Sequence, residues 1–304
     1  TALTAIASTG GKIVVREGTY TFSDRVSHTM GGKTVILEGQ GRVVINSSFL
    51  DPALDVGVFS FTGDSEAVLI IRDITISHTI IENGNRSLCG IRGLVGFKKV
   101  IFENAEVTGV PSYGIKLTGL TMGKIDNCKT TLNKCGGTFL EHCHNTIVEG
   151  GAYDDNGEAV GGGSGLSYGL SVNADSGGNV SENCHVIGIQ AHNNYRKNID
   201  VHGGGRNISI TNCNIKGWGV SGIDWSNSGG ETVLDSIVIS GNTLDGSGTV
   251  TPATTNYGIF AGLTGLATSI GPIIINDNIF KNMAQTTEMR SIRIYNGGGA
   301  SYLR

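Results

Sequence analysis

The stretch Gly-Ile-Asp-Trp at residues 222–225 is one copy of a short pattern that recurs along the second half of the chain. Each copy has two apolar residues flanking one variable residue, the alternation of a β-strand with one buried face. The other copies are Gly-Ile-Lys-Leu at 114–117, Gly-Leu-Ser-Val at 169–172, Asn-Ile-Asp-Val at 198–201, Gly-Ile-Phe-Ala at 258–261 and Ser-Ile-Arg-Ile at 291–294. A repeated strand with a variable outward residue indicates a protein built of stacked coils.

The spacing of the first apolar residue in each copy gives the length of one coil. Ile91, Ile115 and Thr138 are 24 and 23 residues apart, and the longest interval, from Ile223 to Ile259, is 36 residues. A minimum interval between copies, with some longer intervals, is expected for a three-sided coil that carries loop insertions. A second strand pattern ending in Asn or Gly alternates with the first, at residues 69–74, 100–104, 124–128, 208–215, 237–244 and 273–279.

These two patterns predict an all-β fold, a single-stranded parallel β-helix, or solenoid, with coils about 4.8 Å apart. We expect one domain over residues 1–304, with coils over 11–304 and loop insertions near 152–167 and 245–256. The open end of such a core needs a cover, and residues 1–10 predict a short N-terminal capping helix.

Composition excludes several classes of protein. The chain has 48 Gly but only 4 Pro, which excludes collagen, and it has no run of 18 apolar residues that would insert into a membrane. Charged residues make up 16% and the net charge is −4, so the chain lacks the basic footprint of a nucleic-acid-binding protein.

Cysteine usage predicts free thiols. Cys128, Cys184 and Cys213 each follow an Asn, which predicts one shared repeat position and stacked apolar side chains without disulfides. Free thiols indicate assembly in a reducing compartment.

The N-terminal sequence carries a resemblance to a known superfamily. Residues 9–22 read Thr-Gly-Gly-Lys-Ile-Val-Val-Arg-Glu-Gly-Thr-Tyr-Thr-Phe, and residues 33–45 read Lys-Thr-Val-Ile-Leu-Glu-Gly-Gln-Gly-Arg-Val-Val-Ile. This opening resembles that of pectate-lyase-superfamily right-handed β-helix proteins, with Glu17 where Pro is usual. The Gly-, Ser- and Asn-rich coils look most like a bacteriophage tailspike polysaccharide depolymerase.

The resemblance implies a bacterial polysaccharide as partner, a homotrimer, and a location on a phage virion tail or outside the cell. It leaves hydrolase, lyase and epimerase chemistry open. The epimerase motif Tyr-Gly-x-Asp-Pro-His is matched only in part, by Tyr168-Gly169 and by Asp200 with His202, without the Pro.

The strand register predicts where the reacting groups lie. If Ile199 and Val201 point inward, Asp200 and His202 point outward, and Asp224 lies one coil from Asp200, about 5 Å away. Glu141 lies two coils from Asp200, about 10 Å away. Both the retaining and the inverting spacing of glycosidase carboxyls are therefore available.

We therefore predict Asp200, Asp224, Glu141 and His202 as catalytic residues. In a lyase, the base would be His202 or Lys116, and a cation would neutralise the uronate carboxylate. The short turn over residues 215–221, between the two long insertions, predicts a groove with Trp218 stacking on a sugar. Predicted substrate-binding residues are Lys116, Asn173, Arg196, Lys197, Arg206, Trp218, Arg293 and Tyr295.

Structural alternatives exist for several of these residues. Asp200 and Asp224 could be ladder residues that bind turn amides, His202 a solvated turn residue, and Trp218 a cap on the apolar column. Trp225 is expected in the core. His142-Cys143-His144 has no second ligand pair at suitable spacing, so we predict no metal site and no cofactor, with a bound Ca²⁺ left open.

Overall fold

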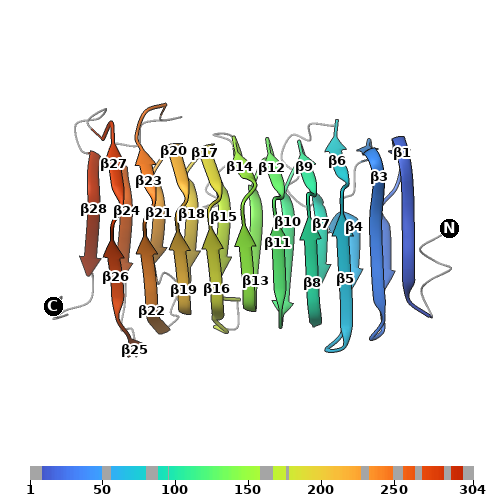
Figure 1. Cartoon of the computed structure of the whole chain (residues 1–304), viewed down its shortest axis with the longest axis horizontal. Helices are drawn as coiled ribbons and strands as arrows, with labels where there is room; N and C mark the ends of the chain where they lie inside the picture. Colours follow the sequence, from blue (N-terminus) through green and yellow to red (C-terminus); the bar gives the residue numbers. More distant parts are fainter. Residues whose placement is uncertain are drawn as a thin grey trace.

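The fold is a parallel β-helix whose coils stack along one long axis (Figure 1). The structure is a computed structural model that describes residues 9–49, 56–79, 88–94, 96–157, 167–175, 178–226, 233–248, 256–263, 269–283 and 289–296. The predicted capping helix lies outside these residues, as do most of the predicted insertions at 152–167 and 245–256. One domain over 1–304 stays a prediction. None of the described residues forms a helix that could cross a membrane.

Each coil contributes strands to three parallel sheets. Sheet 1 contains the strand pattern of residues 222–225 and comprises β2 (Val26–Thr29), β4 (Val56–Thr62), β7 (Leu88–Leu94), β10 (Tyr113–Leu120), the first part of β13 (Gly136–Glu149), β15 (Tyr168–Asn173), β18 (Lys197–His202), β21 (Ser221–Ser226), β24 (Asn256–Leu263) and β28 (Met289–Asn296).

Sheet 2 contains the second strand pattern. It comprises the first parts of β1 (Gly11–Phe22) and β3 (Thr34–Ser47), then β5 (Ala67–Arg72), β8 (Phe97–Glu103), β11 (Gly123–Asp126), the second part of β13, β16 (Ser181–Ile187), β19 (Gly205–Thr211), β22 (Val233–Ser240), β25 (Ser269–Ile270) and β26 (Ile273–Asn276).

Sheet 3 is made of shorter strands, at the upper edge of Figure 1. It comprises the second parts of β1 and β3, then β6 (Thr75–His78), β9 (Glu106–Thr108), β12 (Lys129–Thr131), β14 (Ala152–Asp154), β17 (Gln190–Asn194), β20 (Asn214–Trp218), β23 (Thr243–Asp245) and β27 (Ile279–Lys281).

The predicted coil register is confirmed. Ile199 pairs with Ile223 and Ile223 with Ile259, all fully buried. Because parallel pairing aligns equivalent residues, these side chains form a column, and burial of each contributes about 1.5–3 kcal/mol. Trp225 lies in the neighbouring inward column and is fully buried, so its predicted place in the core is also confirmed.

A ladder of buried asparagines closes the corner between sheets 3 and 1. The Asn133 side chain donates to Asn156 at 3.0 Å, Asn156 donates to Asn194 at 3.0 Å, and Asn194 donates to Asn198 at 2.7 Å. Each amide also binds backbone groups of the turn, which satisfies polar groups that bending the chain would otherwise leave unpaired.

This ladder explains the glycine that begins most copies of the sheet 1 pattern. A Cβ on Gly169 would lie 2.5 Å from the Asn194 side-chain nitrogen, and a Cβ on Gly114 would lie 2.8 Å from that of Asn133. Only glycine leaves room for the amide at these positions.

The cysteines confirm one expectation and correct another. All six are buried and free. However, Cys128 and Cys213 lie at the corner between sheets 2 and 3, whereas Cys184 lies within β16, after the corner between sheets 1 and 2. The prediction of one shared position is wrong because an Asn in the left-handed region serves as the bend at both corners, at Asn127 (φ 49°) and at Asn183 (φ 54°).

We predict that Asn156→Ala lowers the free energy of unfolding by about 2–6 kcal/mol. The change leaves the Asn133 N–H and the Thr130 C=O without the partners that Asn156 provides, at about 1–3 kcal/mol for each buried group. Urea unfolding measures the loss. The exposed Asn214→Ala is the control and should change stability by less than about 0.5 kcal/mol. Equal effects of the two changes would contradict a role for the ladder.

Candidate functional site

The outward side chains of sheet 1 form the predicted columns, but the first column is largely buried. Asp200 pairs with Ser171 on one side and with Asp224 on the other, as the register predicted. Asp200 is 0% exposed and Asp224 is 3% exposed. The two carboxyl groups predicted to be catalytic are therefore enclosed, because register fixes the direction of a side chain but not what covers it.

Lys197 bridges the two aspartates. Its Nζ donates to Asp200 Oδ1 at 2.7 Å and lies 3.0 Å from Asp224 Oδ1, although that second contact lacks the alignment of a hydrogen bond. The remaining carboxylate oxygens accept hydrogen bonds from serines, Ser171 to Asp200 at 3.2 Å and Ser221 to Asp224 at 3.0 Å. The two aspartates are ladder residues, as the structural alternative expected, but they bind a lysine and two serines instead of turn amides.

Burial controls the electrostatics of this cluster. Burial raises the pKa of Asp224, and Lys197 opposes that shift. Burial lowers the pKa of Lys197, but Asp200 and Asp224 raise it by more, so its pKa lies above the usual value. The cluster has one cation for two carboxyl groups, so placing the proton on Asp224 relieves the excess negative charge.

Aromatic rings and cations lie beside one another along the outer side of sheet 1. The Lys116 Nζ lies 5.6 Å from the centre of the Phe139 ring, and the Lys197 Nζ lies 5.3 Å from that of Tyr168. The Arg293 guanidinium lies 5.2 Å from the centre of the Tyr257 ring. Sequence reasoning noted Tyr168 only as part of a partial epimerase motif and missed Tyr257, although the Tyr-Gly pairs at 113–114, 168–169 and 257–258 mark their column.

The second outward column is polar and less deeply buried. It joins Thr118, Glu141, Asn173, His202 and Ser226 on five successive coils. Glu141 and His202 are half-buried, and Asn173 between them is 7% exposed. Thr118 donates to Glu141 at 3.0 Å, and the His202 ring nitrogen lies 3.5 Å from Ser226 Oγ. This column thus offers a carboxyl and an imidazole about 10 Å apart, two coils distant.

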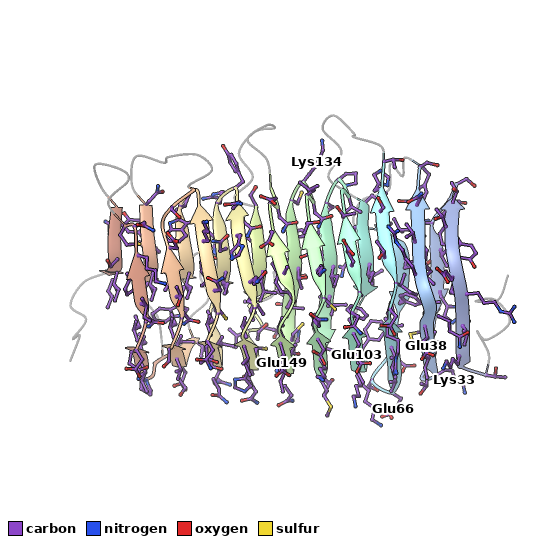
Figure 2. All side chains as sticks on the ribbon, turned by 45° about the horizontal axis from the view of Figure 1, so that its top comes forward. Lys33, Glu38, Glu66, Glu103, Lys134 and Glu149 are labelled. Atoms are coloured by element: carbon purple, nitrogen blue, oxygen red, sulfur yellow. The ribbon has the colours of Figure 1, made fainter. Side chains whose placement is uncertain are left out.

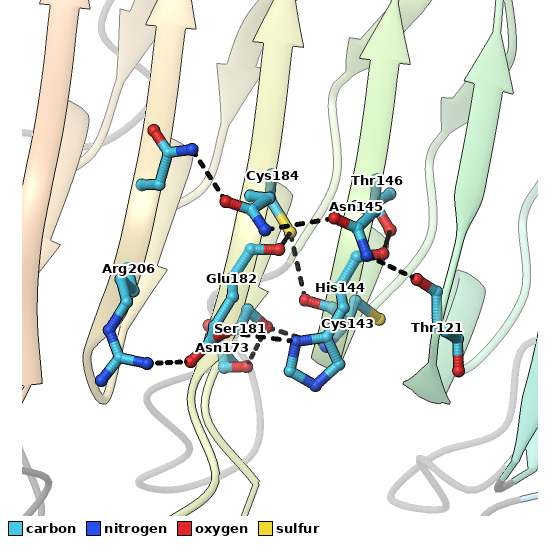
Figure 3. Close-up of polar contacts among 12 residues, drawn as sticks. Thr121, Cys143, His144, Asn145, Thr146, Asn173, Ser181, Glu182, Cys184 and Arg206 are labelled. Atoms are coloured by element: carbon cyan, nitrogen blue, oxygen red, sulfur yellow. Dashed lines mark hydrogen bonds and ion pairs between the residues drawn. The ribbon is translucent and has the colours of Figure 1, made fainter.

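A cluster of histidines and carboxylates adjoins this column where sheet 1 turns into sheet 2, and Figure 3 shows two of its members, His144 and Glu182. The His142 Nδ1 lies 3.4 Å from Asp175, and the His144 Nδ1 lies 3.9 Å from Glu182. The rings of His142 and His144 meet edge to face at 4.9 Å. His142 has a φ of 50°, which bends β13 and brings both rings outward around the buried Cys143. Sequence reasoning considered this segment only as a metal-ligand fragment and assigned it no role.

Several predicted binding residues have other contacts. Trp218 pairs with Asn194 and is 0% exposed, so the prediction that it stacks on a sugar is wrong. It fills the place that the asparagine ladder occupies one coil earlier. The Lys197 charge is taken up by Asp200 and Asp224, so it is not available to neutralise a substrate carboxylate. The exposed Arg206 is bound to Glu182.

The remaining predicted residues are less constrained. Arg196 is half-buried in the turn before β18, and Lys116 is half-buried at the centre of sheet 1. Arg293 contacts the Tyr257 hydroxyl. Tyr295 belongs to β28, but its side chain and the walls of the predicted groove lie outside the described residues. Their roles in binding stay predictions.

One cavity formed by described residues lies away from the predicted site. An apolar cavity lined by Ile13, Val15 and Phe22 lies at the N-terminal end of the core and includes none of the predicted residues. Within the ranges that the structure describes, no three His, Cys, Asp or Glu side chains are placed to hold a metal ion. The arrangement can supply acid–base groups, Glu141 and His202, together with hydrogen-bonding side chains along one strip.

Comparison with known proteins establishes the fold. No protein-family model and no curated protein matches the chain. The Azotobacter vinelandii mannuronan C-5 epimerase AlgE4 A-module matches with a TM-score of 0.53 at 15% identity, over 98% of this chain and 93% of that chain. The Dettilon tailspike protein (gp208) matches with a TM-score of 0.53 at 15% identity, over 92% of this chain. This chain spans 55% of the tailspike chain. The predicted right-handed parallel β-helix is confirmed.

We predict that His144 contributes to a loss of stability in mild acid. Burial lowers the pKa of His144, His142 lowers it further, and Glu182 opposes both. A histidine whose pKa is lowered by folding resists protonation in the folded state, so stability falls as pH drops through the usual histidine pKa of about 6.5. Unfolding at pH values about one unit either side of that value should show a smaller fall for His144→Gln than for the wild type.

The uncharged change Asn214→Ala is the control for this measurement and should shift stability equally at both pH values. The same fall in wild type and His144→Gln would contradict the prediction.

Proposed function

We propose that this chain binds a bacterial surface polysaccharide along the outer side of sheet 1 and cleaves it. The observation that carries the proposal is the polar column from Thr118 to Ser226, which crosses five coils and holds Glu141 and His202 in half-buried positions. An extended strip of this kind suits a chain-like ligand, because successive sugars can contact successive coils. Two structural neighbours are a mannuronan C-5 epimerase module and a tailspike protein, which supports this class of substrate.

We assign the acid–base chemistry to Glu141 and His202. Both are partly accessible, whereas Asp200 and Asp224 are buried and bound to Lys197. The spacing of about 10 Å across two coils leaves room for a sugar between the two groups. Asn173 lies between them and would hydrogen-bond the ligand. Cleavage is either hydrolysis or a lyase elimination in which His202 removes a proton next to a uronate carboxylate.

Assembly and location belong to the same proposal. A tailspike-like role implies a homotrimer carried on a virion tail or released outside the cell, with a glycan as the partner. The free, buried cysteines are compatible with assembly in a reducing cytoplasm.

A second candidate is a glycan-binding adhesin without turnover. The burial of the Asp200 and Asp224 pair favours it, because that pair was the strongest carboxylate pair predicted from sequence. Binding without any change in glycan length, over a broad panel of capsules and O-antigens, would select the adhesin and exclude the depolymerase.

We predict that Glu141→Gln and His202→Gln each lower the cleavage rate about 10²–10⁴-fold, the usual contribution of a positioned acid or base, while glycan binding is retained. Product analysis measures the effect: new reducing ends alone indicate a hydrolase, and an ultraviolet-absorbing unsaturated uronate indicates a lyase.

Two matched changes on sheet 2 control for this experiment. Glu149 lies in the same strand as Glu141 but is exposed at the other sheet (Figure 2), and His185 contacts Ser209 much as His202 contacts Ser226. Glu149→Gln and His185→Gln should keep wild-type activity. Full activity in Glu141→Gln and His202→Gln would overturn the assignment.

A further inference from the structure

The buried cluster of Lys197, Asp200 and Asp224 has no part in the proposed cleavage, and its geometry indicates a chemistry of its own. Lys197 is 6% exposed, Asp200 0% and Asp224 3%. One amine nitrogen lies 2.7 Å from one carboxyl group and 3.0 Å from the other. The Tyr168 ring, 5.3 Å from the amine, adds an apolar wall. An amine and two carboxyl groups are thus held together where water is largely excluded.

We propose that Lys197 and Asp224 condense to an intramolecular amide that joins β18 to β21, with Asp200 as the proton-transfer group. Amine and carboxyl groups do not condense in water, because both are charged and hydrated there. Burial favours the neutral carboxylic acid of Asp224, Asp200 lies within reach of the ammonium proton, and fixed proximity replaces a bimolecular encounter with an intramolecular one.

The two aspartates differ in ways that assign their roles. Asp200 accepts an aligned hydrogen bond from Lys197, so it is placed to take the ammonium proton. Asp224 Oδ1 lies 3.0 Å from the same nitrogen, slightly further than Asp200, and its other oxygen is held by Ser221. Burial also raises the pKa of Asp224, which favours the neutral carboxylic acid, the form that an amine can attack.

The reaction balances without an oxidant or a further reagent. The ammonium proton passes from Lys197 Nζ to the Asp200 carboxylate, and the freed lone pair attacks Asp224 Cγ to form the C–N bond. Asp200 then returns a proton to the departing hydroxyl, the C–O bond breaks, and one water leaves. The products are an amide, one water and a neutral carboxylic acid on Asp200, which keeps the second proton removed from the nitrogen.

The bond would act as a covalent staple between adjacent coils. Lys197 of β18 pairs with Ser221 of β21, and Asp224 lies three residues after Ser221 in β21. The amide would therefore connect two adjacent coils without altering their register. It would also remove the excess buried charge of the cluster, leaving Asp200 hydrogen-bonded to Ser171.

The intact mass of the purified full-length chain tests the proposal. We expect the denatured wild-type protein to be lighter than its sequence by one water molecule. Trypsin should fail to cut after Lys197, and peptide 197–206 should be recovered joined to peptide 217–281, with fragmentation placing the link at Asp224. A wild-type mass equal to that of the sequence would overturn the proposal, whatever the outcome of the glycan experiments.

Substitutions separate this bond from other losses of water. Lys197→Arg keeps the positive charge but should restore the full sequence mass. Persistence of the loss in Lys197→Arg would assign it to a dehydrated aspartate elsewhere and overturn the proposal. Asp200→Asn should lower the linked fraction. Lys124→Arg is the matched control, because Lys124 lies 2.6 Å from Asp126 in an exposed pair, and this change should leave the mass loss intact.

Discussion

The parallel pairing of each coil with the next is the constraint on which the rest of the structure depends. It places equivalent residues one strand spacing apart, so every position of the coil becomes a column along the long axis. The inward columns are largely apolar, as at Ile199 and Ile223. The corner columns must supply hydrogen-bond partners for the backbone groups at each bend, and the ladder from Asn133 to Asn198 does so. Only the outward columns are free to vary, so function has to be sought there.

The outward columns of sheet 1 are not equivalent. The column that holds Asp200 and Asp224 is buried and packs with lysine and aromatic rings, whereas the column that holds Glu141 and His202 reaches the surface. A shift of two positions along the same strand thus leads from a buried structural cluster to a candidate site. The histidine and carboxylate cluster of His144 and Glu182 extends the accessible column around the corner into sheet 2.

Burial of unequal charge makes the Lys197 cluster unusual among the ion pairs of the described residues. Pairs such as Lys124 with Asp126 are hydrated, and pairs of that kind contribute little to stability. Lys197 is enclosed with two carboxyl groups, and removing these charges from water carries a desolvation cost that exposed pairs do not have. We therefore interpret the cluster as a reactive group of side chains and not as a source of folding stability.

Sequence alone determined the repeat, the register and the direction of each side chain on sheet 1, because a strand alternates faces and parallel coils repeat at a fixed minimum length. Those rules alone predict that Asp200 lies beside Asp224 and that Glu141 lies in the column of His202. The depth of each side chain was decided by tertiary structure. Trp218 and Asp200 lie on elements whose sequence predicts exposure, yet both are buried, since enclosure depends on neighbouring coils and corner ladders far away in the chain. A local sequence pattern predicts the direction of a side chain, but the residues that surround that side chain are defined only by the packed molecule.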